Sequence, residues 1–331
     1  MSGLEKNSAN AAPKRGVYCL ANDVVIEWFE AFIRSYQLQN AALPLTVIPF
    51  NDNITRLKSL QARFHFEILG EAHSCHFDAL ANQVMGNSRL AGAYRKFACF
   101  FGPYDEFLFL DSDIVVTSSL LPLFATYAGS ECDLVYFDYA LDMAYAPDLA
   151  ARMLAEYGSH GINTGAFLSR KGILREADLW PLAEKAAAVR DGLLPDVLEQ
   201  SFFNFVFDVS RCRMVGMEKL LPELAPKAWA RQPFHYDRQK RTATTPEGKI
   251  LPFIHWPGCG YPTMVRPEIF LHYRTWGMTL GERLNYKRTF YYLRFRRQLK
   301  QTLLKSKFCS GLLAVRSRRL QEKRAGAIPS A

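Results

Sequence analysis

Long apolar runs are missing from this chain, and their absence excludes several classes of protein. No stretch approaches the roughly 18 consecutive apolar residues that a membrane-spanning helix requires. The first fifteen residues are polar and contain no apolar core of a secretory signal. We therefore expect residues 1–15 to form a disordered N-terminal segment and the protein to be cytoplasmic.

Paired cysteines are also missing. The seven cysteines lie singly and no Cys-x-x-Cys pair occurs, so neither a zinc cage nor a disulfide framework is expected. Internal repeats and low-complexity tracts are absent. The hydrophobic content of 49% and the charged content of 22% are ordinary for a globular protein, and 331 residues can bury the core of one large domain or of two.

Acidic residues are nearly absent from one region near the end of the sequence. Residues 283–324 contain fourteen Lys or Arg and one Glu, a local charge of +13 in a chain whose net charge is +9, so the remainder carries −4. Aromatic and aliphatic residues alternate with these cations at helical spacing, which is typical of a helix on an anionic membrane surface. The alternatives are a basic helix packed on its own domain and a contact with nucleic-acid phosphates, and of the three we favour the membrane surface.

Apolar runs alternate with segments of helical periodicity over the first half of the chain. This alternation predicts an α/β layer fold with a mostly parallel sheet. Expected strands cover 16–21, 45–50, 64–69, 107–110, 133–138 and 161–169, and expected helices cover 25–36, 91–101, 118–128, 180–189 and 196–207. Asp23, Asn51 and Asp111 follow three of these strands, at the edge where such sheets bind ligands. The polar segment 234–249 is expected to be a surface loop or flap.

Two carboxylates close the most apolar of these runs. Asp111 and Asp113 follow Phe107–Leu110 and precede Ile114–Val116. An unpaired charge in a buried strand costs several kcal/mol. The two carboxylates are therefore more favourably placed at the end of the strand, facing a cation. Mg²⁺ is typically held by one or two carboxylates together with substrate phosphates. The segment therefore indicates a metal that holds a diphosphate, although an Asp-Ser-Asp turn explains it equally well.

Further motifs follow in a characteristic order. In sequence they are Arg95, Asp111-Ser112-Asp113, Asn163-Thr164-Gly165, Glu199-Gln200-Ser201-Phe202-Phe203-Asn204 and His255-Trp256-Pro257-Gly258. In order and spacing this set resembles glycosyltransferase family 8, the retaining enzymes of the glycogenin and lipopolysaccharide galactosyltransferase type. The resemblance covers roughly 17–262. It departs from the family pattern at Tyr261, where a lysine is usual, and at Glu199 and Ser201, where aspartates are usual.

The resemblance implies a GT-A nucleotide-diphospho-sugar transferase fold, with a Rossmann-like sheet flanked by helices. It places the catalytic domain at 16–280, followed by a basic aromatic helical extension at 281–331. It implies an enzyme that transfers a hexose, with retention of configuration, from a nucleotide-diphosphate sugar (UDP-linked) to a glycan or lipid-linked acceptor. An amide at the far face of the sugar is a poor nucleophile, so front-side attack is the better hypothesis.

The resemblance also assigns roles to individual residues. Mn²⁺, or Mg²⁺, would be held by Asp111, Asp113 and His255. Donor binding would involve Arg95, which contacts the diphosphate or the sugar, together with Asp111, Ser112, Asp113, Asn204 and Gly258. The catalytic positions would be Asn163, Glu199 and Gln200.

Two other functions are compatible with the Asp pair. A haloacid-dehalogenase-type phosphatase would use Asp111 as its nucleophile, but that motif usually lies near the start of its domain and gives no role to His255. A non-catalytic GT-A-like binding protein is the second alternative, because the usual lysine is replaced by Tyr261.

Overall fold

The computed structural model describes residues 12–86, 91–197 and 199–305, with side chains as far as 303. The chain divides between Pro257 and Gly258 into two compact units. The predicted division at residue 280 remains a prediction. Among the described residues, no helix is both long and apolar enough to cross a bilayer.

The first unit is built around a seven-stranded sheet in the order β3-β2-β1-β4-β7-β6-β8. β7 pairs antiparallel with both of its neighbours, and the other pairs in this sheet are parallel. The predicted mostly parallel α/β fold is therefore confirmed. The strands of this sheet are β1 (Arg15–Ala21), β2 (Leu45–Pro49), β3 (Glu67–Ile68), β4 (Glu106–Leu110), β6 (Leu134–Tyr136), β7 (Ala166–Arg170) and β8 (Met214–Gly216).

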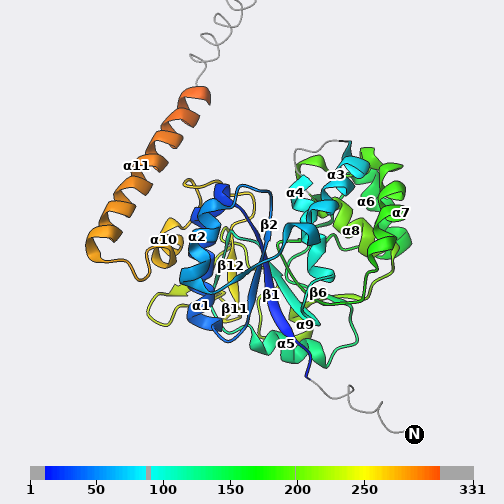
Figure 1. Cartoon of the computed structure of the whole chain (residues 1–331), viewed down its shortest axis with the longest axis horizontal. Helices are drawn as coiled ribbons and strands as arrows, with labels where there is room; N and C mark the ends of the chain where they lie inside the picture. Colours follow the sequence, from blue (N-terminus) through cyan, green and yellow to red (C-terminus); the bar gives the residue numbers. More distant parts are fainter. Residues whose placement is uncertain (1–11, 87–90, 198, 306–331) are drawn as a thin grey trace, which may run out of the picture. The chain divides into compact units, whose positions relative to one another are not determined.

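Helices cover both faces of the sheet (Figure 1). The strands are apolar on both faces because each face has its own core: Phe107 and Phe109 of β4 pack into one, and Leu108 and Leu110 into the other. The helices on the first face are α3 (Asp78–Met85), α4 (Ala91–Tyr94), α6 (Pro147–Tyr157), α7 (Glu176–Ala187) and α8 (Gln200–Val209). Those on the second are α1 (Ile26–Asn40), α2 (Thr55–Phe64), α5 (Leu121–Ala128) and α9 (Met217–Leu220).

Several expected elements differ in extent from the observed ones. The helix expected over 91–101 is α4 followed by the 3₁₀ helix η4 (Arg95–Phe100), and the strand expected over 64–69 has two residues. The segment 234–249, expected to be a surface loop or flap, contains a hairpin of two short strands, β9 (His235–Asp237) and β10 (Thr242–Thr244). β10 also pairs with β11 (Ile250–Leu251), which follows the segment. A separate antiparallel pair joins β5 (Ile114–Val116) to β12 (Phe253–His255).

The second unit contains two described helices, α10 (Pro267–Arg274) and α11 (Leu280–Lys305). Phe290 of α11 is fully buried and stacks on Phe270 of α10. Arg294 donates to the carbonyl oxygens of Pro262 and Met264, at 3.0 and 2.7 Å. One face of α11 therefore packs within its own unit.

Candidate functional site

Backbone pairing brings three distant residues to one edge of the sheet. Asp111 directly follows β4, and its N–H donates to the carbonyl of Gly165, 2.8 Å away. Asp113 directly precedes β5, where His255 of β12 pairs with Ile114. The N–H of Trp256 also donates to the carbonyl of Asp113 at 3.1 Å. The antiparallel β5–β12 pair therefore places the imidazole beside the two carboxylates.

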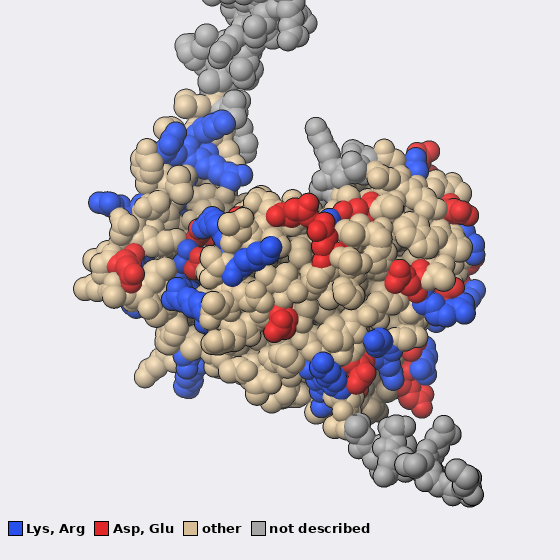
Figure 2. Space-filling model, in the orientation of Figure 1, with Lys and Arg blue, Asp and Glu red and all other residues tan. Residues whose placement is uncertain are grey.

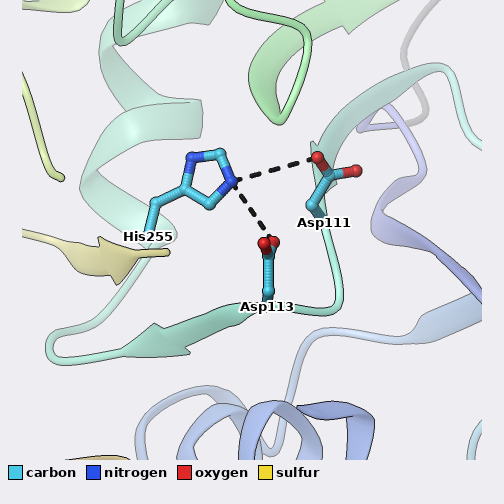
Figure 3. A group of neighbouring side chains, drawn as sticks. All are labelled: Asp111, Asp113 and His255. Atoms are coloured by element: carbon cyan, nitrogen blue, oxygen red, sulfur yellow. Dashed lines mark ion pairs between the residues drawn. The ribbon is translucent and has the colours of Figure 1, made fainter. Parts of the chain in front are cut away.

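The three side chains converge on one point (Figure 3). The Nε2 atom of His255 lies 3.2 Å from Asp113 Oδ1 and 4.0 Å from Asp111 Oδ2. One ligand atom from each residue lies within 4.8 Å of the other two. His255 is buried, whereas Asp111 and Asp113 keep 32% and 23% of their side chains exposed. This geometry leaves one side open to a ligand.

The electrostatics of this cluster fit a divalent cation. Burial raises the pKa of Asp111, Lys96 lowers it and Asp113 raises it, with a net rise. Burial lowers the pKa of His255, but the two carboxylates outweigh burial and the net pKa is raised. Both pKa values are raised because the carboxylates concentrate negative charge where little water can solvate it. Two carboxylate oxygens and one imidazole nitrogen form a donor set suited to Mn²⁺, with Mg²⁺ less favoured by the nitrogen.

Gly165 makes the close approach possible. A Cβ atom at this position would lie 2.4 Å from His255 Cε1 and 2.8 Å from Asp111 Oδ2. Asn163 supports the same turn, because its Oδ1 accepts from the N–H of Gly165 at 2.9 Å. The Asn-x-Gly motif thus has a steric function, since only glycine fits between the Asp and the His.

Lys96 is the basic residue that faces the cluster. Its Nζ lies 2.5 Å from Glu199 Oε1 and 3.5 Å from Asp111 Oδ1, and it donates to the carbonyl of Thr164 at 3.0 Å. Burial lowers the pKa of Lys96, but Asp111 and Glu199 outweigh burial, so the net pKa is raised. Lys96 is therefore a buried cation that links the Asp-x-Asp segment to the residue preceding α8.

Arg95, the residue expected to bind the donor, points to different partners. Its guanidinium makes two hydrogen bonds to the carboxylate of Asp78, at 2.8 and 2.7 Å, and a third to the carbonyl of Pro49 at 3.3 Å. The assignment of Arg95 to the diphosphate stays a prediction. Lys96 was not predicted, because it directly follows Arg95 and no local pattern in the sequence separates these two basic neighbours.

The residues of the 199–204 segment are buried and hydrogen-bonded inside the protein. Glu199 Oε1 accepts from the Thr164 hydroxyl at 2.8 Å. Gln200 accepts from the N–H of Thr164 and donates to the carbonyl of Met143. Asn204 accepts from the N–H of Ile162 and donates to the carbonyls of Ile162 and Gln200. These contacts hold the 162–165 turn against α8, and the predicted contacts with sugar remain predictions.

Ser112 and Gly258 are the two remaining residues that were predicted to bind the donor. Ser112 is buried between the two aspartates. Gly258 has φ +65°, a left-handed conformation that favours glycine, and is the first residue of the second unit. A contact of either residue with a donor stays a prediction.

Comparison with solved structures shows the fold. The galactosyltransferase LgtC, in complex with donor and acceptor sugar analogs, matches with a TM-score of 0.51 at 15% identity, over 80% of this chain and 97% of LgtC. The fold is therefore that of the GT-A glycosyltransferases. The expected resemblance to family 8 is confirmed at the level of the fold.

Two other solved structures match less closely. They are the WbbM bifunctional glycosyltransferase (TM-score 0.49, 16% identity, over 84% of this chain and 52% of WbbM) and GlyE of Streptococcus pneumoniae TIGR4 (TM-score 0.46, 15% identity, over 83% of this chain and 63% of GlyE). The chain thus spans about half of WbbM and somewhat less than two thirds of GlyE. No family model matches the chain, and no curated protein matches it in sequence.

Proposed function

We propose that this protein is a metal-dependent glycosyltransferase that transfers a hexose from a nucleotide-diphosphate sugar, UDP-linked, to a glycan or lipid-linked acceptor with retention of configuration. The convergence of Asp111, Asp113 and His255 at the ligand-binding edge of a GT-A sheet carries this proposal. The likeness to LgtC, which was solved with donor and acceptor sugar analogs, supports it.

Asp111, Asp113 and His255 would hold Mn²⁺, or Mg²⁺, at this edge. When bound, such an ion acts as a Lewis acid that neutralises the charge of a departing diphosphate. The partly exposed faces of Asp111 and Asp113 leave room for phosphate oxygens. Lys96 fixes the other oxygen of Asp111, so that the carboxylate keeps one orientation.

The residues at the proposed sugar site favour front-side attack. The carboxylate of Glu199 is paired with Lys96 and accepts from Thr164, so it is not a free nucleophile. Gln200 is a neutral amide with both of its ends hydrogen-bonded. Buried polar groups of this kind are better suited to orient a sugar than to attack it. Asn163 and Gln200 would therefore position the donor, while the acceptor hydroxyl attacks from the side of the leaving group.

Two rival functions can be separated from this proposal. A phosphatase that uses Asp111 as its nucleophile gives no role to His255, which lies 3.2 Å from Asp113. It would also form a covalent phospho-aspartate, so a trapped adduct that disappears in Asp111→Asn would favour the phosphatase. A binding protein without activity would use the same open face, so absence of donor turnover in the unmodified protein would favour it.

The exposed face of α11 supports a lipid surface as a partner. Six apolar side chains of this helix are between 47% and 63% exposed: Leu284, Tyr291, Tyr292, Phe295, Leu299 and Leu303. Leu284, Tyr291, Phe295 and Leu299 follow helical spacing and form one stripe, which points away from the side that buries Phe290.

Three cations of the same helix are exposed: Arg288 lies within this stripe, and Arg296 and Lys300 follow round the helix from Leu299. Figure 2 shows Lys and Arg gathered along the helix. An apolar stripe with flanking cations fits the surface of an anionic membrane. We therefore propose that the protein works at the cytoplasmic face of such a membrane, where a lipid-linked acceptor would be found.

The test of the catalytic proposal is donor hydrolysis in the presence of Mn²⁺. Asp111→Asn and Asp113→Asn preserve side-chain size, so folding should survive, while turnover of UDP-hexoses should fall by about two orders of magnitude or more. Ser130→Ala, which changes a surface turn away from this cluster, is the matched control. Full activity in both Asn variants would overturn the proposal.

A further inference from the structure

An exposed aromatic side chain lies at the same sheet edge as the proposed metal site. Tyr139 comes three residues after the end of β6 and is 42% exposed. β4 and β6 each pair antiparallel with β7, so they run in the same direction and their carboxyl ends share one edge of the sheet. Only β7 separates them, and two strand spacings amount to roughly 10 Å. Tyr139 therefore lies near the Asp111 end of β4 without belonging to the metal cluster.

The backbone on both sides of Tyr139 is fixed by the segment that contains the Asn-x-Gly turn. The N–H of Asn163 donates to the carbonyl of Asp138 at 2.9 Å. The N–H of Ala140 donates to the carbonyl of Gly161 at 2.6 Å. Gly161 has φ +67°, and a Cβ atom at this position would overlap the backbone of residues 140–141. The turn that supports the metal cluster therefore also sets the position of Tyr139.

A partly exposed lysine adjoins the Tyr139 ring. The Nζ atom of Lys227 lies 5.5 Å from the centroid of the Tyr139 ring and 5.4 Å from that of the Trp229 ring, both within the range of a cation–π contact. Trp229 pairs directly with His255 through the backbone, and residues opposite each other in a β pair share one side. Burial raises the pKa of Asp138, and the charge of Lys227 acts against this rise. The ammonium of Lys227 is thus held beside two aromatic rings at the border of the metal cluster.

Two further rings support Tyr139 by their edges. The ring centroids of Tyr136 and His160 lie 5.9 and 6.4 Å from that of Tyr139, at interplanar angles of 70° and 62°. Such edge contacts hold an aromatic ring without stacking flat on its face. Tyr136 is buried, so the support comes from the core, and the exposed part of the Tyr139 ring remains accessible to a ligand.

We propose that Tyr139 and Lys227 form the acceptor subsite and that this subsite recognises a pyranose ring. One face of a pyranose is formed by C–H groups, which would pack on the Tyr139 ring. Its hydroxyls accept hydrogen bonds, and the ammonium of Lys227 has three N–H groups to donate. The separation of two strands from the end of β4 is comparable to the length of a hexose with its phosphate. This inference rests on the proposed function, and it makes a sugar ring, rather than a lipid or peptide part, the group that the acceptor presents.

Sugar binding in the absence of metal and donor tests the inference. Saturation-transfer NMR on the full chain measures the affinity for methyl β-glucopyranoside and methyl β-galactopyranoside, and the protons of one C–H face should receive the strongest transfer. Tyr139→Ala should weaken binding about tenfold, a loss typical of truncating an aromatic contact. Tyr139→Phe keeps the ring and should bind as the unmodified protein does. Tyr292→Ala, which removes a tyrosine that is 58% exposed on α11 of the second unit, is the matched control.

Two further arms separate the sugar from other ligands. Lys227→Met removes the ammonium and should weaken both pyranosides about 3- to 10-fold. Uridine is the third probe, because a nucleoside base also stacks on aromatic rings; loss of uridine binding alone in Tyr139→Ala would overturn the inference.

The inference would also be overturned if the unmodified protein bound neither pyranoside, or if Tyr139→Ala or Lys227→Met bound both as tightly as the unmodified protein does. The assay contains neither metal nor donor, so its result does not depend on the proposed function. That function fails separately, if the unmodified protein shows no Mn²⁺-dependent donor hydrolysis.

Discussion

The ammonium of Lys96 and the carboxylate of Glu199 lie 2.5 Å apart, and each side chain is only 3% exposed. Asp111 shares the same ammonium at 3.5 Å. A cation buried between two acids ties the residue before α8 to the end of β4. The pair thereby connects the proposed sugar site with the proposed metal site.

Removing one member of this pair should be costly. Lys96→Met leaves Glu199 without its cation, and breaking a buried ion pair typically destabilises a protein by about 3–5 kcal/mol. Urea unfolding measures the loss. Arg15→Met is the control, because its 2.8 Å pair with Glu106 is partly exposed and should contribute about 1 kcal/mol or less. Equal losses in the two variants would show that burial does not make the contacts of Lys96 more costly to lose than an exposed ion pair.

Gly165→Ala should disturb the metal cluster by steric overlap. The new methyl group would lie 2.4 Å from the His255 ring, and overpacking of this kind costs about 1–3 kcal/mol. We expect lower stability and weaker Mn²⁺ binding, measured by thermal unfolding and by metal titration. At Gly129 a Cβ would make only an ordinary contact at 3.7 Å, so Gly129→Ala should bind Mn²⁺ normally. A Gly165→Ala variant with unaltered Mn²⁺ affinity would contradict the described geometry.

The exposed face of α11 should govern binding to anionic vesicles. Replacing Arg288, Arg296 and Lys300 by Gln removes three cations, each of which contributes about 1 kcal/mol near an anionic surface. Vesicle co-sedimentation should fall accordingly, and Phe295→Ser should reduce it further. High salt should weaken the unmodified protein's binding, since the Debye length falls to about 3 Å at 1 M. Lys185→Gln on α7 is the matched control; an equal loss in that variant would show that α11 has no special role.

Asp208 should make stability depend on pH. Burial raises its pKa, against the hydrogen bonds of Ser159 and Tyr145, so the folded state holds the proton more tightly than the unfolded state. This contribution to stability is therefore complete below the ordinary carboxyl pKa of 3.8 and is lost as pH rises through the raised folded pKa.

Asp208→Asn has no such ionisation. Its melting temperature, relative to that of the unmodified protein, should consequently be higher at pH 7 than at pH 4. Differential scanning calorimetry at the two values checks the sign. A difference that does not change with pH would show that Asp208 keeps an ordinary pKa in the folded protein.

A strand could be predicted from the sequence where an unbroken apolar run shows that both of its faces are buried. Phe107–Leu110 is apolar at every position because helices cover both faces of the sheet, and so the strand and its exit at Asp111 were recognisable. The grouping of Asp111, Asp113 and His255 also followed from motif order, and the structure brings their ligand atoms within 4.8 Å. Their role as metal ligands remains a prediction.

Other features depend on long-range contacts that leave no local pattern. Arg95 pairs with Asp78, whereas Lys96 pairs with Glu199 and Asp111, and these partners are brought to η4 only by the tertiary fold. The antiparallel direction of β7 likewise follows from its pairing with β4 and β6.

The β5–β12 pair has a consequence for the order in which activity can arise. β12 is the last strand of the first unit, whereas β5 follows directly on the Asp-x-Asp segment. A chain still being synthesised could complete the seven-stranded sheet before β12 exists, and it would then present two carboxylates without their histidine. Pairing between segments so distant in sequence is also slow to form. The assembly of His255 with the Asp-x-Asp segment would thus come late in the folding of the first unit.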